Sequence, residues 1–235
     1  MEPTNLFSSE MLYNFARGPL VWISFIIFFL GSIIQIVKLF LLTRNKESIK
    51  LNLKSDDKKD SSLEPQGGSL AHLIAKLKLT IIGVSPVTIA ITVIFHVLLF
   101  MVPVFLLAHN ILLDNAWGIS FFAFSEHFAD ILTIIFFACV LFFLYRRIFV
   151  ARVRAITSFY DYYILFLATV PFLTGFFAYH QIFDYRTVII LHMLLGELML
   201  ISIPFTKIIH MFFFFIFRFF VVNEYTLGKG NRTWK

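Results

Sequence analysis

The segment Leu191-His192-Met193-Leu194-Leu195-Gly196-Glu197 lies in an apolar stretch, residues 188–220, which also contains His210. The two histidines are 18 residues apart, which is about five turns of an α-helix or about 27 Å. This length is close to the ~30 Å hydrocarbon core of a bilayer. The spacing therefore predicts one membrane-spanning helix with an imidazole near each face, both on the same side. Polar rings inside a membrane are costly and usually functional, so the pair suggests two haems stacked across a membrane.

The composition is that of a membrane protein. Of the 235 residues, 59% are hydrophobic and only 14% are charged, whereas soluble domains average about 25% charged. We expect an all-α membrane protein, a bundle of five transmembrane helices in the inner (cytoplasmic) membrane. The formal net charge of +6 comes from loop residues that set orientation, and we expect no nucleic-acid binding. The single cysteine, Cys139, excludes a disulfide within the chain, a cysteine-ligated cluster and covalent haem.

Five apolar stretches are long enough to cross a bilayer. We expect helices at 20–42, 81–108, 119–145, 160–179 and 188–220. Pro19 is expected in the first turn of the first helix, where its missing N–H has no helical partner. The first ten residues are polar and no small-residue cleavage site follows, which predicts no cleavable signal.

The organisation of the chain follows from one long polar stretch. We predict a lead with the first transmembrane helix at 1–42, a cytoplasmic polar loop at 43–79, a four-helix haem-binding core at 80–221 and a cytoplasmic tail at 222–235. Only Arg17 and Arg186 fall on one predicted side, while the other 18 of the 20 Lys and Arg residues lie at or near the opposite side. The positive-inside rule then places the N-terminus in the periplasm and the C-terminus in the cytoplasm.

Two more histidines, His96 and His109, lie in the predicted second span. By depth, His109 pairs with His192 near the outer face, and His96 pairs with His210 near the inner face. Each pair could supply both axial nitrogens of a low-spin haem b. Gly196, four residues after His192 on the same face, would let a flat macrocycle approach the helix. The alternative is that all four histidines bond to backbone carbonyls between helices and hold no metal.

The outer pair has a geometric difficulty. His96 and His109 are 13 residues apart, which leaves them about 140° apart on a straight helix. Pro103 lies between them and can kink the helix. His109 could also lie beyond the last regular turn.

These residues resemble a known family. The pattern Leu191-His192 … Leu195-Gly196 … Pro204-Phe205 … Ile209-His210 is similar to the last helix of the respiratory nitrate reductase gamma subunit, a di-haem cytochrome b. The block from Arg146-Arg147 to Asp161 is similar to its third cytoplasmic-side loop. The opening Phe15-Ala16-Arg17-Gly18-Pro19-Leu20-Val21-Trp22, with His109-Asn110 and Gly196-Glu197, is closer to the membrane haem b subunits of the Dsr, Tmc and Hmc complexes of sulphate reducers. The resemblance covers about residues 80–213.

The resemblance implies a di-haem b subunit of an anaerobic respiratory complex. It implies two non-covalent b haems, ligated through haem iron by His96, His109, His192 and His210. Electrons would pass between menaquinol or a periplasmic multihaem cytochrome c and a cytoplasmic iron–sulfur subunit, with menaquinone as a second candidate cofactor. Whether the subunit itself oxidises quinol, and is thus an enzyme, stays open. The wider His96–His109 spacing and the charged loop at 43–78 depart from nitrate reductase.

The competing class is a haem-free membrane scaffold or transporter subunit. The chain has no internal repeat and no pair of broken helices in corresponding positions. Both absences argue against a secondary transporter.

A group of polar residues at the outer side forms the candidate quinone site. Carboxylates and imidazoles can accept the protons of a quinol. The simpler explanation is a polar helix start at the water boundary. The candidates are Glu126, His127, Asp130 and His180.

Two further polar features also have two interpretations each. Glu197 is about 140° around the helix from His192, and is either a proton relay or a hydrogen-bond partner of another helix. Lys207 and the Arg146–Arg154 cluster either pair with haem propionates or an acidic partner, or only set the topology.

Overall fold

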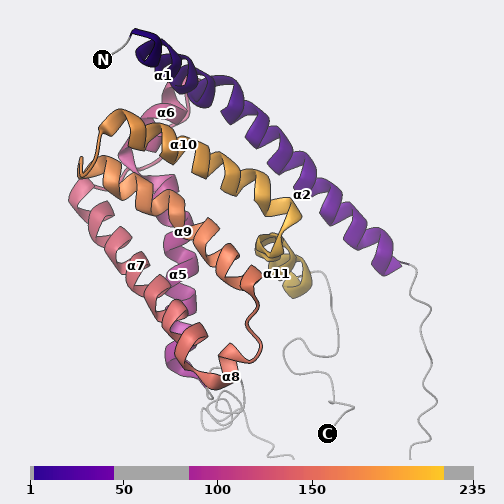
Figure 1. Ribbon diagram of the computed structural model, residues 1–235. Helices are drawn as coiled ribbons and strands as arrows, with labels where there is room; N and C mark the ends of the chain where they lie inside the picture. Colours follow the sequence, from indigo (N-terminus) through magenta and orange to yellow (C-terminus); the bar gives the residue numbers. More distant parts are fainter. Residues whose placement is uncertain (1–2, 45–84, 220–235) are drawn as a thin grey trace, which may run out of the picture. The chain divides into compact units, whose positions relative to one another are not determined.

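The computed structural model describes residues 3–44 and 85–219, with side chains at 9–42 and 85–216 (Figure 1). The predicted cytoplasmic tail lies outside these residues, as does the predicted polar loop except for its first two residues, which belong to the end of the first long helix. Every regular element in the described part is helical. Five of its helices are long and apolar enough to cross a bilayer. The predicted class, an all-α protein with five spans, is therefore confirmed, and the chain is a multi-pass helical membrane protein.

The chain divides into two compact units, which are described separately. The first unit comprises Met1–Glu47 and Thr157–Lys235, and the second comprises Ser48–Ile156. His192 and His210 belong to the first unit, and His96 and His109 belong to the second.

The first unit begins with a continuous helical segment. It runs through α1 (Pro3–Phe15), the π-helical turn η1 (Ala16–Leu20) and α2 (Val21–Arg44). Pro19 lies inside the π-helical turn, so the prediction that it opens the first span is wrong. The wider π turn accommodates the residue that cannot donate a backbone hydrogen bond.

The two other long helices of this unit begin at side-chain caps. α9 (Phe159–Tyr179) starts with a capping box, in which Ser158 and the Asp161 carboxylate satisfy each other's backbone N–H. α10 (Tyr185–Ser202) starts at Asp184, whose carboxylate accepts from the Thr187 N–H at 2.9 Å. The Thr187 hydroxyl and N–H also keep the pKa of Asp184 below its usual value. The fourth predicted span thus agrees with α9 to within one residue.

The prediction of one straight helix over 188–220 is wrong. α10 ends at Ser202 and is followed by two short 3₁₀ helices, η2 (Ile203–Phe205) and η3 (Lys207–Ile209), and then by α11 (His210–Phe219). Pro204 has no N–H to continue the helical ladder. Thr206 is extended, with φ −121° and ψ 177°. His192 and His210 therefore do not share one face of a single straight helix, and the ~27 Å spacing no longer applies.

α10 packs against both α9 and α2 (Figure 1). The contact with α2 depends on Gly31, where an added Cβ would lie 2.8 Å from both Cβ and Cγ of Pro204. The Gln35 side chain donates to the Pro204 carbonyl at 3.0 Å. A glycine and an amide of α2 thus hold the segment where α10 ends.

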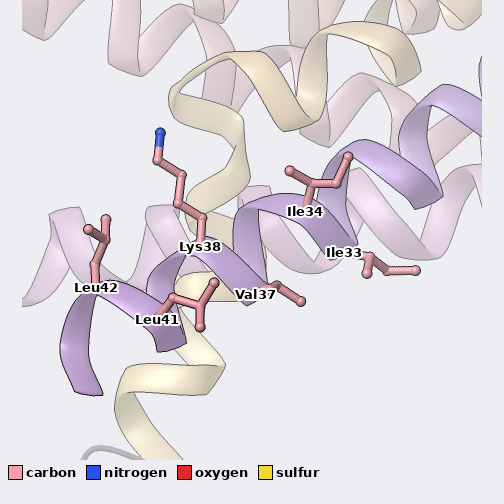
Figure 2. Close-up of a pocket in the computed structure, with 6 residues that line it drawn as sticks. All are labelled: Ile33, Ile34, Val37, Lys38, Leu41 and Leu42. Carbon is pink, nitrogen blue, oxygen red and sulfur yellow. The ribbon is translucent and has the colours of Figure 1, made fainter. Parts of the chain in front are cut away.

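Part of the surface of α2 near its C-terminal end is exposed and mostly apolar. Figure 2 shows the side chains that line a shallow surface pocket there, on consecutive turns of α2. A helix that exposes large aliphatic side chains along its length is suited to contact with lipid. The pocket is lined by Ile33, Ile34, Val37, Lys38, Leu41 and Leu42.

The second unit contains α5 (Pro86–Phe105), α6 (Leu107–Trp117), α7 (Glu126–Phe149) and the short α8 (Ala151–Arg154). α5 and α7 pack through aromatic rings. Phe95 stacks on Phe136 with centroids 5.0 Å apart, and its ring meets the edge of Phe143 at 5.3 Å. These two long helices form the apolar centre of the unit.

Two predicted boundaries in this unit are wrong. The second span was expected to continue to residue 108, but α5 ends at Phe105 because Leu106 is extended (φ −70°, ψ 131°). The third span was expected from residue 119, but α7 begins at Glu126. Gly118, with φ +65°, ends α6 in the left-handed conformation, which glycine adopts without strain. Hydropathy alone does not detect these breaks, since the residues around them are apolar.

Candidate functional site

His192 is positioned by α9. Its Nδ1 lies 2.9 Å from the Pro171 carbonyl oxygen and 3.3 Å from the Thr174 hydroxyl. An added Cβ on Gly175 would come within 3.1 Å of the ring. The absence of a side chain at Gly175 therefore lets the imidazole lie against the neighbouring helix.

These contacts set the tautomer of His192. A carbonyl oxygen only accepts, so Nδ1 must carry the hydrogen. In a neutral ring the lone pair is then on Nε2. This is the usual state of a metal-ligating histidine, which donates its second N–H to a carbonyl or carboxylate.

The other three predicted ligands have the same arrangement. The Nδ1 of His96 lies 2.7 Å from the Thr92 carbonyl, one turn earlier in α5. The Nδ1 of His210 lies 2.7 Å from the Lys207 carbonyl in η3. His109 completes the set, with its Nδ1 2.8 Å from the Pro103 carbonyl. In all four residues singled out as haem ligands, Nδ1 thus lies within hydrogen-bond distance of a backbone carbonyl, and in a neutral ring that donates through Nδ1 the lone pair is on Nε2.

The site of His109 is created by the break in the second span. Beyond Leu106, the Asn110 amide donates to the carbonyls of Val104 and Leu106 at 3.0 and 3.1 Å. Its oxygen accepts from the Phe121 N–H at 2.7 Å. Asn110 is 3% exposed, and it stabilises the break that places His109 on a separate helix. The angle of about 140° between His96 and His109 holds only for a straight helix. Because the two residues lie on different helices, it no longer argues against the outer pair.

Gly196 lies on the same face of α10 as His192, one turn later. A Cβ added to Gly196 would meet no heavy atom within 4 Å. The helix face beside His192 thus has space for a planar group. The four histidines have the donor chemistry of axial haem ligands, and the space at Gly196 would admit a macrocycle beside one of them, His192.

His210 is held indirectly by an ion pair. The ammonium of Lys207 lies 2.8 Å from an Asp161 carboxylate oxygen and 5.2 Å from the centre of the Tyr160 ring. The carbonyl of the same lysine accepts from His210 Nδ1. Asp161 thereby connects the N-terminus of α9 to the segment that orients His210. The predicted partners for Lys207 are a haem propionate or an acidic protein. In the structure its ammonium group instead pairs with Asp161 of the same chain.

Replacing Asp161 with asparagine should therefore loosen η3 and the ring of His210. We expect little loss of stability, since exposed ion pairs contribute about 0.2–1 kcal/mol. We expect a lower occupancy or a shifted midpoint potential of one b haem, measured by haem content and redox titration of the purified protein. Asp114→Asn, an exposed carboxylate on α6, is the matched control. Identical haem content and potentials in the two variants would contradict this role of Asp161.

Gly175 gives a second prediction about positioning. Gly175→Val should push the His192 ring away from Pro171 and remove or perturb one b haem, visible in the reduced-minus-oxidised spectrum. At Gly18 an added Cβ would meet no atom within 4 Å, so Gly18→Val is the control. A normal spectrum for Gly175→Val would show that the ring does not need this position.

The quinone-site candidates are divided between the two units, and their grouping as one site stays a prediction. Glu126, His127 and Asp130 lie in the first turns of α7, where Glu126 and His127 are exposed. Because the span begins at Glu126, the simpler explanation of a polar helix start accounts for these residues. His180 ends α9 in the other unit, with its ring 4.3 Å from that of Phe176.

Glu197 is buried in the first unit. Its exposed fraction is 5%, and within the described residues neither carboxylate oxygen has a hydrogen-bond partner. The predicted hydrogen bond to a neighbouring helix is thus not formed. The described residues also contain no group of three or more His, Cys, Asp or Glu placed to bind a metal ion.

Sequence reasoning did not identify the residues that position the histidines. Thr174 and Gly175 lie in an apolar span, and only the packing of α10 reveals their part. In the sequence, Asn110 stands out only through the His109-Asn110 pattern of the family resemblance. A carboxamide in an apolar stretch, close to a proline, is the sequence feature that could have indicated a break in the helix at this point.

The comparisons with known proteins are limited. No family model matches the chain. Over 139 residues the chain is 32% identical to a protein of Nitratidesulfovibrio vulgaris strain Hildenborough. The matched segment is 59% of this chain and 62% of that protein. The chain thus covers less than two thirds of this relative's length.

Proposed function

We propose that the protein is the di-haem b membrane subunit of a respiratory electron-transfer complex. The observation that supports it most is the shared state of His96, His109, His192 and His210. Each ring donates its Nδ1–H to a backbone carbonyl at 2.7–2.9 Å, and so presents Nε2 as a ligand for iron. A haem-free scaffold with structural histidines would show the same Nδ1 contacts, so iron binding at Nε2 distinguishes the two classes.

The proposal keeps the pairing by depth. His109 and His192 would hold the outer haem, and His96 and His210 the inner haem. His210 follows the end of the last span, which suits a position near the membrane boundary. Each pair takes one histidine from each unit, so the pairing is itself part of what is proposed.

The chain's own residues have three tasks in this function. Bound haem iron supplies one-electron chemistry by changing its oxidation state. The carbonyls of Thr92, Pro103, Pro171 and Lys207 orient the rings and fix their tautomers. The aromatic contacts around Phe95 exclude water next to His96, whose ring is 5.2 Å from that of Phe95. The open face at Gly196 leaves room beside His192.

The partners and the orientation belong to the same proposal. We place the N-terminus in the periplasm and the C-terminus in the cytoplasm of the inner membrane, following the distribution of Lys and Arg. Electrons would pass between menaquinol or a periplasmic multihaem cytochrome c on one side and a cytoplasmic iron–sulfur subunit on the other. The basic residues for such docking lie at the end of α7 and in α8. They are Arg146, Arg147, Arg152 and Arg154.

The function can be tested in sealed vesicles. The purified full-length protein is reconstituted around trapped ferricyanide, and a water-soluble menaquinol analogue or reduced cytochrome c is added outside. We expect reduction of the trapped ferricyanide at a rate that protein-free vesicles do not reach. His210→Ala should abolish this reduction, and Asp114→Asn should not change it. No difference between vesicles with and without the protein would refute transmembrane electron transfer.

A further inference from the structure

Glu197 is the group whose surroundings the electron-transfer function does not explain. Its side chain is buried, and within the described residues neither carboxylate oxygen has a hydrogen-bond partner. A carboxyl group in such surroundings has to be compensated by a proton or by a partner. Carboxylates inside membrane spans are accordingly functional candidates.

Contacts between two parallel helical segments indicate what faces Glu197. The α1–α2 segment and α10 run in the same direction. Glu10 lies 3.9 Å from Arg186 near one end, and Gly31 meets Pro204 near the other. Residues seven positions, or about two turns, before a contacting pair form another layer on the same faces. Seven residues before Gly31 and Pro204 are Ser24 and Glu197. The Glu10–Arg186 pair, which joins two long exposed side chains, differs from this register by three residues, so the assignment rests on the close Gly31–Pro204 contact.

Burial agrees with this register. Ser24 is 0% exposed and Glu197 is 5% exposed, as expected for residues on facing sides of two packed helices. Glu197 is also about 140° around the helix from His192, whose ring is directed toward α9. The carboxyl group therefore belongs to the side of α10 that packs on α2.

Ser24 has the chemistry of a partner for a protonated carboxyl group. Its hydroxyl donates to the Leu20 carbonyl at 2.8 Å. The lone pairs of the hydroxyl oxygen can then accept the O–H of a carboxylic acid. Leu20 is the last residue of the π-helical turn η1, and such turns occur frequently at functional sites.

Among the described side chains of α10 and the elements packed on it, no other ionisable group shares this layer by register. α10 packs against η1, α2, α9 and η2. Arg17 precedes Ser24 by seven residues, Lys38 follows it by fourteen, and His192 is about 7.5 Å from Glu197 along the helix axis. The ionisable side chains described on α10 and these elements are Arg17, Lys38, Tyr160, Asp161, Tyr162, Tyr163, Tyr179, Tyr185, Arg186 and His192.

We propose that Glu197 and Ser24 form an intramembrane proton-binding site, which takes up one proton when the protein accepts an electron. The electron comes from the quinol or cytochrome c of the proposed function, on which this inference rests. The Glu197 carboxylate binds one proton from water and becomes a carboxylic acid. Its O–H then forms a hydrogen bond to Ser24 Oγ that the carboxylate does not make in the present structure. On reoxidation the O–H bond breaks and the proton returns to water. One electron and one proton thus enter the protein on reduction, and both leave it on reoxidation.

Redox-induced infrared difference spectroscopy tests this site. The purified full-length protein is reduced with dithionite and reoxidised with ferricyanide, and haem absorbance is recorded in the same cell. We expect the C=O band of a carboxylic acid to appear on reduction and to shift in D₂O. Glu197→Gln should abolish the band, Ser24→Ala should shift its frequency, and Glu10→Gln, at an exposed position, should leave it unchanged.

The outcomes separate the two proposals. Two results would overturn the proton site and leave the proposed function standing. In the first, the haem bands respond to reduction but no carboxyl band appears. In the second, the carboxyl band appears but persists in Glu197→Gln. The absence of haem bands would overturn the proposed function, and the redox-linked proton with it. If Glu197→Gln does not accumulate in membranes, Ser24→Ala decides, because an unchanged C=O frequency would overturn the pairing.

Discussion

Replacement of His192 by alanine is expected to remove one of two b haems and to leave the other in place. The imidazole would be an axial ligand, and a b haem that loses one of its two histidines is held by a single bond to iron. His192→Ala should therefore halve the haem content per chain. His210→Ala should do the same, with loss of the other spectral component. The measurement is the haem content of each purified variant, with reduced-minus-oxidised spectra to identify the missing component.

The matched control for these variants is another histidine with ring contacts. His180 lies 4.3 Å from Phe176 by ring centroids and is not a predicted ligand, so His180→Ala should retain both haems. Full haem content in His192→Ala or His210→Ala would remove that residue from the ligand set. Loss of a haem in His127→Ala would show that the pairing is wrong.

Replacement of Gly31 by valine is expected to separate α2 from the end of α10. A Cβ at this position would lie 2.8 Å from two carbons of Pro204, and a proline ring cannot turn aside as a flexible side chain would. Overpacking of this kind typically costs about 1–3 kcal/mol. The gain in helix propensity on replacing a glycine is smaller, at most about 1 kcal/mol, so the clash prevails. The midpoint of thermal unfolding in detergent should fall.

A double-mutant cycle isolates the contact itself. Gly31→Ala and Pro204→Ala are compared with the double variant, since alanine at residue 204 removes Cγ, one of the two carbons that the new Cβ would meet, and leaves a Cβ that is no longer fixed in a ring. We expect the double variant to be more stable than the sum of the single effects predicts. Strict additivity would show that Gly31 and Pro204 do not limit the approach of these helices.

The fold class could be predicted because composition and hydropathy report it directly. The chain has 32 Phe and 59% hydrophobic residues, and the five spans follow from runs of apolar residues. The bounds of α9 were also predictable, since Ser158 and Asp161 form a capping box with its own sequence pattern.

The interior breaks could not be predicted from hydropathy. Leu106 and the immediate neighbours of Pro204, Ile203 and Phe205, are as apolar as the helices they separate. The breaks are stabilised by side chains from outside them. Asn110 donates to the carbonyls of Val104 and Leu106 at one break, and Gln35 of α2 donates to the Pro204 carbonyl at the other. A proline alone gives no certain boundary: Pro171 lies within α9 without ending it.

The ligand histidines could be proposed from the sequence, but the residues that orient them could not. The Nδ1 contacts of His96, His109 and His210 are local, reaching three to six residues back. The contact of His192 reaches Pro171 on another helix. Which residues line α9 opposite His192 depends on how α10 packs, and this information is tertiary.

The most direct test of the central claim is the haem content of the purified, full-length protein. A pyridine haemochrome assay, corrected for any cytochrome c, measures b haem per chain. The account predicts two b haems per chain, with two separate midpoint potentials in a redox titration. A protein that folds and is purified without b haem would contradict the account and return all four histidines to structural roles.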